Sequence, residues 1–237
     1  MVKPYDYRVR AALALVRVSG ERETLEGLHH AIELEIAKRV KRIDEAHASG
    51  NQEFDDAVTN DECSQIEELL GLAFVAAQSF ITAVRARWTM IAPVCRDEYA
   101  INFSFSIGPK GSGLLRESPV LPIGSPYHAV EVINAVANYW KHVDEWPTTW
   151  MKNDETLKTV WDLASMQNNN EKRTVEIAIA LGMSAGSSGN LRDAASSLGI
   201  TQYSNLSVIR KVLFDWAECL YEKAKNEVQG AVQESDI

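Results

Sequence analysis

The chain has 237 residues, a formal net charge of −9 at pH 7, and 46% hydrophobic against 24% charged residues. A chain of this length and composition forms one large or two small globular domains, and it can bury a core without disulfides or metal ions. The acidic charge excludes a general attraction to phosphate backbones, so a nucleic-acid contact would require a local basic patch.

The cysteines give no sign of a disulfide framework or a metal site. Three of them lie far apart without a CxxC pair: Cys63, Cys95 and Cys219. Reduced cysteines fit a cytoplasmic protein, and the absence of ligand spacing gives no reason to expect a metal or a cofactor.

No segment of the sequence predicts a membrane span. Asp6, Arg8 and Arg10 interrupt the N-terminal segment, which argues against a signal peptide. The longest near-continuous apolar run, residues 69–84, contains Gln78 and has charged residues at both ends. It is too short and too polar to cross a bilayer, so we interpret it as a buried helix.

Two short segments could supply a local basic patch. They are residues 38–42, which read KRVKR, and the pair Arg85 and Arg87. We interpret both as solvated charge on helix surfaces, which is the usual role of such runs.

The first strong element is a long amphipathic helix after residue 20. Its apolar residues recur at steps of three and four, as on one face of a helix: Leu25, Leu28, Ile32, Ile36, Val40 and Ile43. Gly50 is a natural stop for this helix, and an acidic loop at residues 53–56 is expected to follow.

A second long helix is predicted to begin near residues 61–64, where Ser64 and Glu67 have the spacing of a capping box. Apolar residues on most sides of its middle predict a central position among the other helices. Pro93 is expected to end it, because proline has no N–H to donate. Two long helices joined by a polar loop predict an antiparallel hairpin.

Residues 95–126 interrupt the helical pattern with a high density of glycine and proline. Within them Ile101, Phe103 and Phe105 alternate with polar residues, as in a short strand whose partner would be residues 114–121. An insertion of this kind is either a functional flap or a mobile loop, and it could hold a short β-hairpin.

Helices are predicted again for the rest of the chain. A third strong helix begins after Pro126 and runs to about residue 145, before Pro147. Four more are expected: one after Asp154, one from Asn170 to Gly182, one from Asn190 to Gly199, and one over residues 204–228. The end of the chain, residues 227–237, is expected to fray.

The predicted fold class is all-α. A long antiparallel helical hairpin packs with further helices, and the Gly/Pro-rich insertion interrupts them. Residues 1–147 would form a helical core that includes the insertion 95–126. Residues 148–237 would form a C-terminal helical portion packed on this core, unless the two parts make one continuous domain.

The helix after Pro126 carries a polar stripe over three turns: Glu131, Asn134, Asn138, Lys141 and His142. Its opposite side is apolar, and aromatic residues such as Tyr139 and Trp146 gather nearby. The stripe is either a solvated face without function or a functional site. Asn and His favour the second interpretation, because Lys and Glu are better helix formers for an exposed face. Glu131, Asn134, Tyr139 and Trp146 are the candidate binding residues.

This organisation resembles the HEPN family of helical domains over about residues 20–146. Many HEPN proteins are ribonucleases of toxin–antitoxin, abortive-infection and CRISPR systems, and others are non-catalytic nucleotide- or RNA-binding modules. The family motif is an Arg, a polar residue, a few further residues and a His. Asn138 matches the polar position and His142 matches the His, but Ala137 stands in the position of the Arg.

The resemblance implies metal-independent cleavage of RNA, in which the ribose 2′-hydroxyl attacks the adjacent phosphate. His142, Asn138 and Lys141 are then the candidate catalytic residues, since a His can move protons near neutral pH. Lys141 is the only cation next to the motif, and a lysine cannot grip a phosphate bidentately as the missing Arg would. Reduced or absent nuclease activity is therefore expected. The resemblance also implies a homodimer.

A second motif lies at residues 182–186, which read Gly-Met-Ser-Ala-Gly, the pattern of the α/β-hydrolase nucleophile elbow. Those enzymes place their catalytic His after the serine, whereas all five histidines here precede Ser184. A serine hydrolase is therefore the least favoured alternative. Glu33 and Glu67 lack the Glu-x-x-His spacing of a di-iron bundle, so no metal ligands are assigned.

Two function hypotheses stay open. The first is a HEPN-like, RNA-associated protein of bacterial defence or stress, weakened as a ribonuclease. The second is a non-enzymatic, dimeric helical scaffold or protein-binding module, with the aromatic cluster of residues 140–150 as its contact surface.

Overall fold

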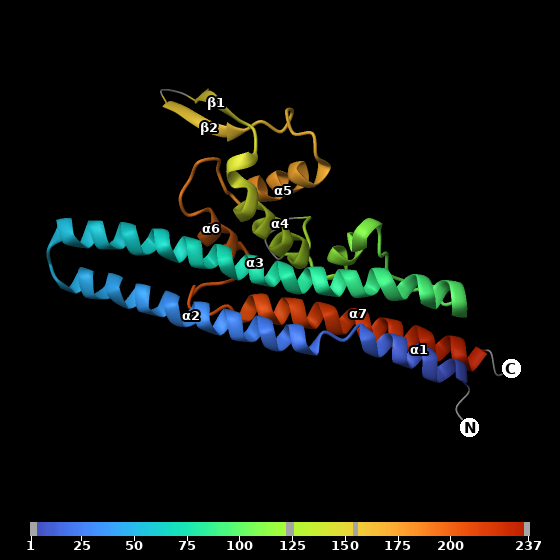
Figure 1. Cartoon of the computed structure of the whole chain (residues 1–237). Coiled ribbons are helices and arrows are strands. Elements are labelled where there is room, and N and C mark those ends of the chain that lie inside the picture. Colours follow the sequence, from blue (N-terminus) through green and yellow to red (C-terminus); the bar gives the residue numbers. More distant parts are fainter. Residues whose placement is uncertain (1–3, 122–125, 154–155, 235–237) are drawn as a thin grey trace.

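The computed structural model describes residues 4–121, 126–153 and 156–234. The fold is mostly helical, as the sequence predicts, and it contains one small two-stranded sheet (Figure 1). Its helices are α1 (Pro4–Leu15), α2 (Ser19–Ala48), α3 (Gln52–Tyr99), α4 (Ala129–His142), α5 (Asn169–Ala180), α6 (Asn190–Ser197) and α7 (Ser207–Glu234).

Helices α2 and α3 form the long antiparallel hairpin (Figure 1). The turn between them is shorter than predicted, because the acidic residues 53–56 belong to α3. Gly50 adopts a φ of 69°, and the Asn51 side chain caps α3 by accepting a hydrogen bond from the Phe54 N–H. The expected helix end at Pro93 is wrong. Pro93 lies on the exposed side of α3, and the helix continues to Tyr99, where Ala100 takes a left-handed conformation.

Helix α3 is long and apolar enough to span a membrane, judged by length and composition alone. Half of the qualifying window is buried inside the fold, and core helices of soluble proteins meet the same criterion. Here the buried residues of α3, which include Phe74, Ala77 and Ile81, belong to the hydrophobic core of the described fold.

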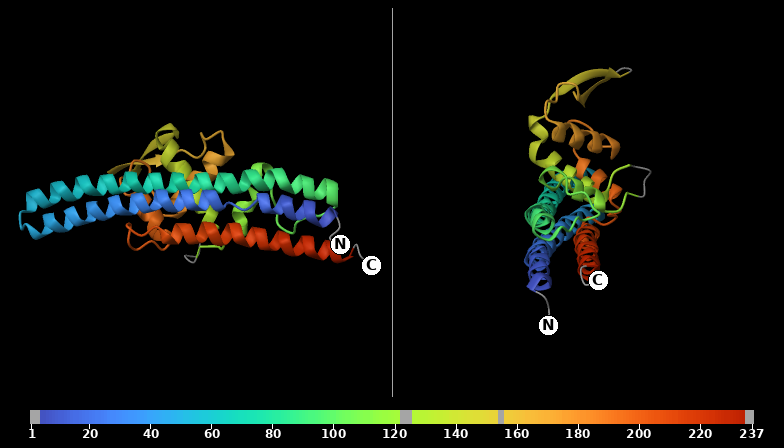
Figure 2. Two further views of the ribbon diagram at one scale, coloured as in Figure 1. Left: turned by 60° about the horizontal axis from the view of Figure 1, so that its bottom comes forward. Right: turned by 90° about the vertical axis from the view of Figure 1, so that its right-hand side faces the viewer.

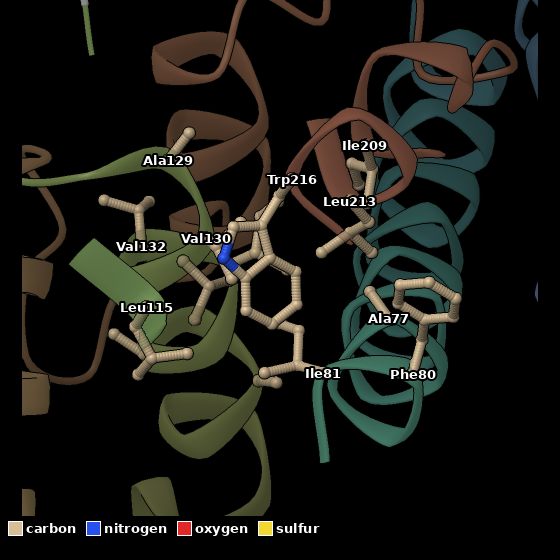
Figure 3. Packing of buried hydrophobic residues seen from close by; sticks show 14 of the residues in the cluster. Ala77, Phe80, Ile81, Leu115, Ala129, Val130, Val132, Ile209, Leu213 and Trp216 are labelled. Carbon is tan, nitrogen blue, oxygen red and sulfur yellow. The ribbon is translucent and has the colours of Figure 1, made fainter. Parts of the chain in front are cut away.

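Helix α7 returns along the hairpin, and α1, which the sequence analysis does not predict, lies beside it (Figure 2). Trp216 of α7 is buried where α3, α4 and α7 meet, and Figure 3 shows its indole among Ile81, Leu115 and Val130. Its Nε1–H donates a hydrogen bond of 2.8 Å to the Leu114 carbonyl, which ties the insertion to the core. The aromatic ring therefore adds a directed contact to the area that it buries.

Two glutamates of the hairpin cap helices of the C-terminal part. A Glu33 carboxylate oxygen accepts from the Leu206 N–H at 2.6 Å and from Arg210 at 2.9 Å, at the start of α7. Glu67 accepts in the same way from the Leu191 N–H, near the start of α6. Carboxylates at helix N-termini meet unpaired N–H groups and the positive end of the dipole. The two residues considered for a di-iron site thus hold separate helices.

The insertion contains no β-hairpin within its described residues, so that expectation is wrong. Its described part forms two short 3₁₀ helices, η1 (Pro109–Gly111) and η2 (Gly113–Glu117), and one isolated bridge joins Val120 to His128. Phe103 and Phe105 alternate with polar residues because they stack on each other and lie edge-on to Trp88 of α3. The alternation of apolar and polar residues therefore reflects packing of the two phenylalanine rings on α3 and not strand pairing in a sheet.

The structure has a β-hairpin at residues 148–161 instead, so the helix predicted after Asp154 is wrong. Strand β1 (Thr148–Asn153) pairs antiparallel with β2 (Thr156–Trp161), and Thr148 is opposite Trp161. These strands contain four threonines, two tryptophans and one valine, residues that favour the pleated conformation over a helix. The hairpin projects from the bundle on the side of α4 and α5 (Figures 1 and 2).

The helices predicted after Asn170, after Asn190 and over residues 204–228 are confirmed. Gly182 and Gly199 follow α5 and α6 with φ values of 82° and 85°, which a residue without a side chain adopts at least cost. Helix α7 extends to Glu234, further than the predicted fraying point at residue 227. The last residues, 235–237, lie outside the described part of the chain.

Candidate functional site

A cavity of about 620 Å³ lies between α3, α4, α5 and the insertion. Its size is within the range of small-molecule and cofactor sites, about 300 to 1,000 Å³. The walls come from four parts of the chain that are distant in sequence. Helix α4 contributes most of the polar stripe: Glu131, Asn134, Asn138 and Lys141 all line the cavity. These residues meet there because steps of three and four positions place them on one side of the helix.

An amide cluster forms one wall of the cavity. The Gln78 Nε2 group of α3 donates to Asn138 Oδ1 at 2.7 Å and to Asn134 Oδ1 at 3.2 Å, and it also approaches the Asn134 carbonyl at 3.3 Å. Gln78 interrupts the apolar run of α3, and its contact with α4 explains why a polar residue stands there. The helical spacing of the sequence does not predict this role of Gln78, although a lone Gln in a buried helix indicates a hydrogen-bonding partner.

Four cations line the same cavity: Arg85, Arg116, Lys141 and Arg173. Among the described residues of the lining, Glu131 is the one acidic residue, so they carry an excess of three positive charges in a chain with a net charge of −9. Arg116 and Lys141 are exposed and have no ion-pair partner within the described residues. Such a local excess of positive charge attracts anions despite the acidity of the whole chain.

Two of the cations are fixed by the protein. Arg85 donates from Nε and Nη2 to the Lys110 carbonyl at 3.1 and 2.7 Å, which ties η1 to α3, and burial lowers the pKa of its guanidinium. Arg173 of α5 donates from Nε and Nη2 to Glu131 Oε1 at 3.0 and 2.9 Å, and it lies over the Tyr127 ring. These contacts hold both guanidinium groups at the cavity wall.

Glu131 is an unusual member of this wall. Its side chain is only 10% exposed, and Arg173 occupies one of its two carboxylate oxygens. The other oxygen, Oε2, is buried and accepts no hydrogen bond from any residue that the structure describes. A buried, unpaired carboxylate oxygen is costly, so this atom marks a place where a donor would be favourable.

His142 lies outside the lining of the cavity. Its side chain is 46% exposed, and its Nδ1 is 2.9 Å from Glu145 Oε2. His142 is the last residue of α4 and has a φ of −128°, so the regular helix ends there and the four-residue spacing from Asn138 does not bring both side chains into the cavity. Ala137, in the position of the missing Arg, is fully buried in the core.

The two aromatic candidates belong to a separate buried cluster. Tyr139 packs against Trp146 and Trp161, with ring centroids 5.8 and 6.0 Å apart, and its hydroxyl accepts a hydrogen bond from Asn190 Nδ2 at 2.7 Å. Burial raises the pKa of this phenol. Tyr139 and Trp146 thus join the β1–β2 hairpin and α6 to α4, and they do not line the cavity.

The remaining sequence candidates are placed as follows. Ser184 lies in the loop between α5 and α6, where Asn190 bonds its backbone N–H and carbonyl, so the strand-to-helix context of a nucleophile elbow is missing. In the basic segment 38–42, Arg39 and Arg42 pair with the buried Glu62. Of the two candidate basic patches, residues 38–42 do not line the cavity, and the pair Arg85 and Arg87 contributes Arg85 alone.

Within the described ranges, no group of three or more His, Cys, Asp or Glu side chains is placed to hold a metal ion. Comparison of the chain with protein-family models, with curated proteins and with solved structures finds no match.

Proposed function

We propose that this chain is an RNA-associated protein that binds a phosphate-bearing segment of RNA in the cavity between α3, α4 and α5. The observation that carries the proposal is the convergence of Arg85, Arg116, Lys141 and Arg173 on one cavity of an acidic chain. Arginine matches phosphate with paired N–H groups, and lysine adds a point charge. The resemblance to HEPN domains supports a role in bacterial defence or stress.

The amide cluster supports RNA over a simple inorganic anion. Gln78, Asn134 and Asn138 offer donors and acceptors beside the cations, and such groups can hydrogen-bond to sugars and base edges. A cavity of about 620 Å³ takes a short segment of a single strand, whereas a double helix is far wider than any pocket of this size.

The proposed role is binding without efficient cleavage. His142 does not line the cavity where the cations converge, and the buried Ala137 offers no charge to a phosphate. A general acid or base must reach the proton that it moves, and His142 does not lie on the wall where the phosphate would bind. We therefore expect His142→Ala to leave RNA affinity unchanged.

The test measures fluorescence polarisation of a labelled, single-stranded oligoribonucleotide at about 50 and about 200 mM salt. The wild type should bind at low salt and lose affinity as salt rises. Arg116→Ala combined with Lys141→Ala should weaken binding at least tenfold, because two phosphate contacts are removed. Lys211→Ala is the matched control, since Lys211 is an exposed lysine of α7 away from the cavity. No retention at low salt, or equal affinity of the double variant, would overturn the proposal.

A second candidate function is a homodimeric scaffold whose contact surface is the β1–β2 hairpin. Trp150 and Leu157 are 71% and 66% exposed, and the strand register places them on the same face as the buried Trp161. A two-stranded hairpin alone is marginally stable, so an exposed tryptophan on it favours a partner. We propose a second copy of this chain as that partner, because the resemblance in the sequence also implies a homodimer.

Light scattering coupled to size-exclusion chromatography distinguishes a dimer from a monomer of this chain. The wild type should elute with twice the 26.4 kDa mass of one chain. Trp150→Ser should give a monomer, whereas Met151→Ser, on the opposite face of the same strand, should stay dimeric. A monomeric wild type, or equal effects of the two variants, would contradict this candidate.

A further inference from the structure

We infer that the cavity selects ribonucleotides over deoxyribonucleotides, and that Glu131 and Asn134 make this choice by binding a ribose 2′-hydroxyl. The inference rests on the proposed function, since it names the chemical group that the same cavity recognises. It starts from two polar groups of α4 that the protein leaves unpaired.

The first group is the Glu131 carboxylate. Arg173 holds Oε1, while Oε2 is buried beside the cavity without a donor among the described residues. The last torsion of a glutamate is broad, so a small rotation of the carboxylate, with Arg173 still donating to Oε1, can bring Oε2 toward a donor in the cavity. Because the group is charged and largely out of water, a hydrogen bond to it is worth more than an exposed one.

The second group is the Asn134 amide, whose orientation follows from its neighbours. A backbone carbonyl can only accept, so the Gln78 atom that approaches the Asn134 carbonyl must be the amide nitrogen. That nitrogen also donates to Asn134 Oδ1, which leaves Asn134 Nδ2 as a donor without a partner in the described part of the chain. The same reasoning leaves Asn138 Nδ2 free.

These two groups suit a hydroxyl. Glu131 and Asn134 are three residues apart on α4, so their side chains are neighbours on the cavity wall. One offers an acceptor and the other a donor, and a hydroxyl both donates and accepts through a single oxygen. The ribose 2′-hydroxyl is such a group, and it is what distinguishes RNA from DNA at a binding site. The four surrounding cations would hold the adjoining phosphates.

The experiment compares three single strands of the same sequence on the wild-type protein: oligoadenylate, its 2′-deoxy form and its 2′-O-methyl form. A 2′-O-methyl group can accept a hydrogen bond but cannot donate one, so it isolates the contact with Glu131. We expect the ribo form to bind about tenfold more tightly than the 2′-O-methyl form, the worth of one hydrogen bond to a charged group. The deoxy form, which also loses the contact with Asn134, should bind more weakly than the ribo form by at least the same factor. These measurements require no variant.

Glu131→Gln then tests the residue itself. It places an amide nitrogen where Oε2 lies, so no acceptor remains for the hydroxyl proton and the ribo form should lose its tenfold advantage over the 2′-O-methyl form. Glu176→Gln is the matched control: Glu176 is the other carboxylate near Arg173 but does not line the cavity, so the tenfold preference should persist.

The outcomes separate the two proposals. Equal, salt-dependent binding of all three strands by the wild type would overturn the inference and leave the proposed function standing. A tenfold preference that survives in Glu131→Gln would also overturn it. Binding of none of the three strands at low salt would overturn the proposed function and the inference together.

Discussion

Gly71 of α3 lies directly against the indole of Trp140 on α4, so closely that a Cβ at position 71 would overlap the ring. The absence of a side chain lets α4 approach α3 closely, about two turns of α3 before Gln78 joins the two helices by its hydrogen bond to Asn138. A small residue here therefore sets the spacing of two walls of the cavity.

Gly71→Ala should destabilise the protein by about 1–3 kcal/mol, because the added methyl group forces the indole or the helix to move. Its control is Gly27→Ala on α2, where no atom lies within 4 Å of the added Cβ, and which should stabilise by about 0.5–1 kcal/mol. Urea unfolding measures both. A Gly71→Ala variant as stable as Gly27→Ala would show that the contact is not tight.

Acid should destabilise the fold through His29. This residue is fully buried, its Nε2 is 3.1 Å from the Ala73 carbonyl, and burial lowers its pKa from 6.5 to about 4. The unfolded chain takes up a proton below about pH 6.5, whereas the folded chain does so only near pH 4. The stabilising contribution is therefore present above pH 6.5 and is lost as the pH falls toward 4, by about 3 kcal/mol.

The measurement is the free energy of unfolding between pH 7 and pH 4 for wild type and His29→Gln. The variant should show a shallower loss of stability over that range, because its side chain does not titrate. His30→Gln, next in sequence and exposed, should keep the wild-type slope. Identical slopes in all three proteins would contradict the assignment to His29.

Glu33→Ala should loosen the start of α7. The change leaves the Leu206 N–H and the Arg210 guanidinium without their shared acceptor, in a site where the Glu33 side chain is 13% exposed. A loss of about 2–3 kcal/mol is expected, since a largely buried charge loses its partner. Thermal unfolding measures it, with Glu26→Ala, an exposed residue of α2, expected within about 0.5 kcal/mol of wild type.

Arg85→Ala should free the part of the insertion that covers the cavity. The Lys110 carbonyl loses both donors of Arg85, and Lys110 itself has a φ of 52°, a conformation that side chains rarely adopt. Amide hydrogen exchange over residues 106–113 should rise about tenfold. Arg96→Ala, which removes an exposed arginine from the same helix, should leave exchange there unchanged.

Local patterns in the sequence determined the helices and one face of the site. The period of α2 and α3 and the glycines after α5 and α6 predict their positions, because hydrophobic spacing and helix stops act over a few residues. The stripe of α4 predicts that Glu131, Asn134, Asn138 and Lys141 lie together for the same reason. The insertion and the β1–β2 hairpin were predicted wrongly, because short alternating segments take their conformation from what they pack on.

Tertiary structure alone decided which residues face that stripe. Gln78 and Arg173 join the site across 60 and 42 positions of sequence, and no local spacing encodes such contacts. It also decided that His142, the centre of the sequence-based hypothesis, leaves the stripe, because α4 ends at that residue and Glu145 holds its ring outside. A helical pattern fixes the face of one helix, whereas packing between helices fixes which chemistry that face meets.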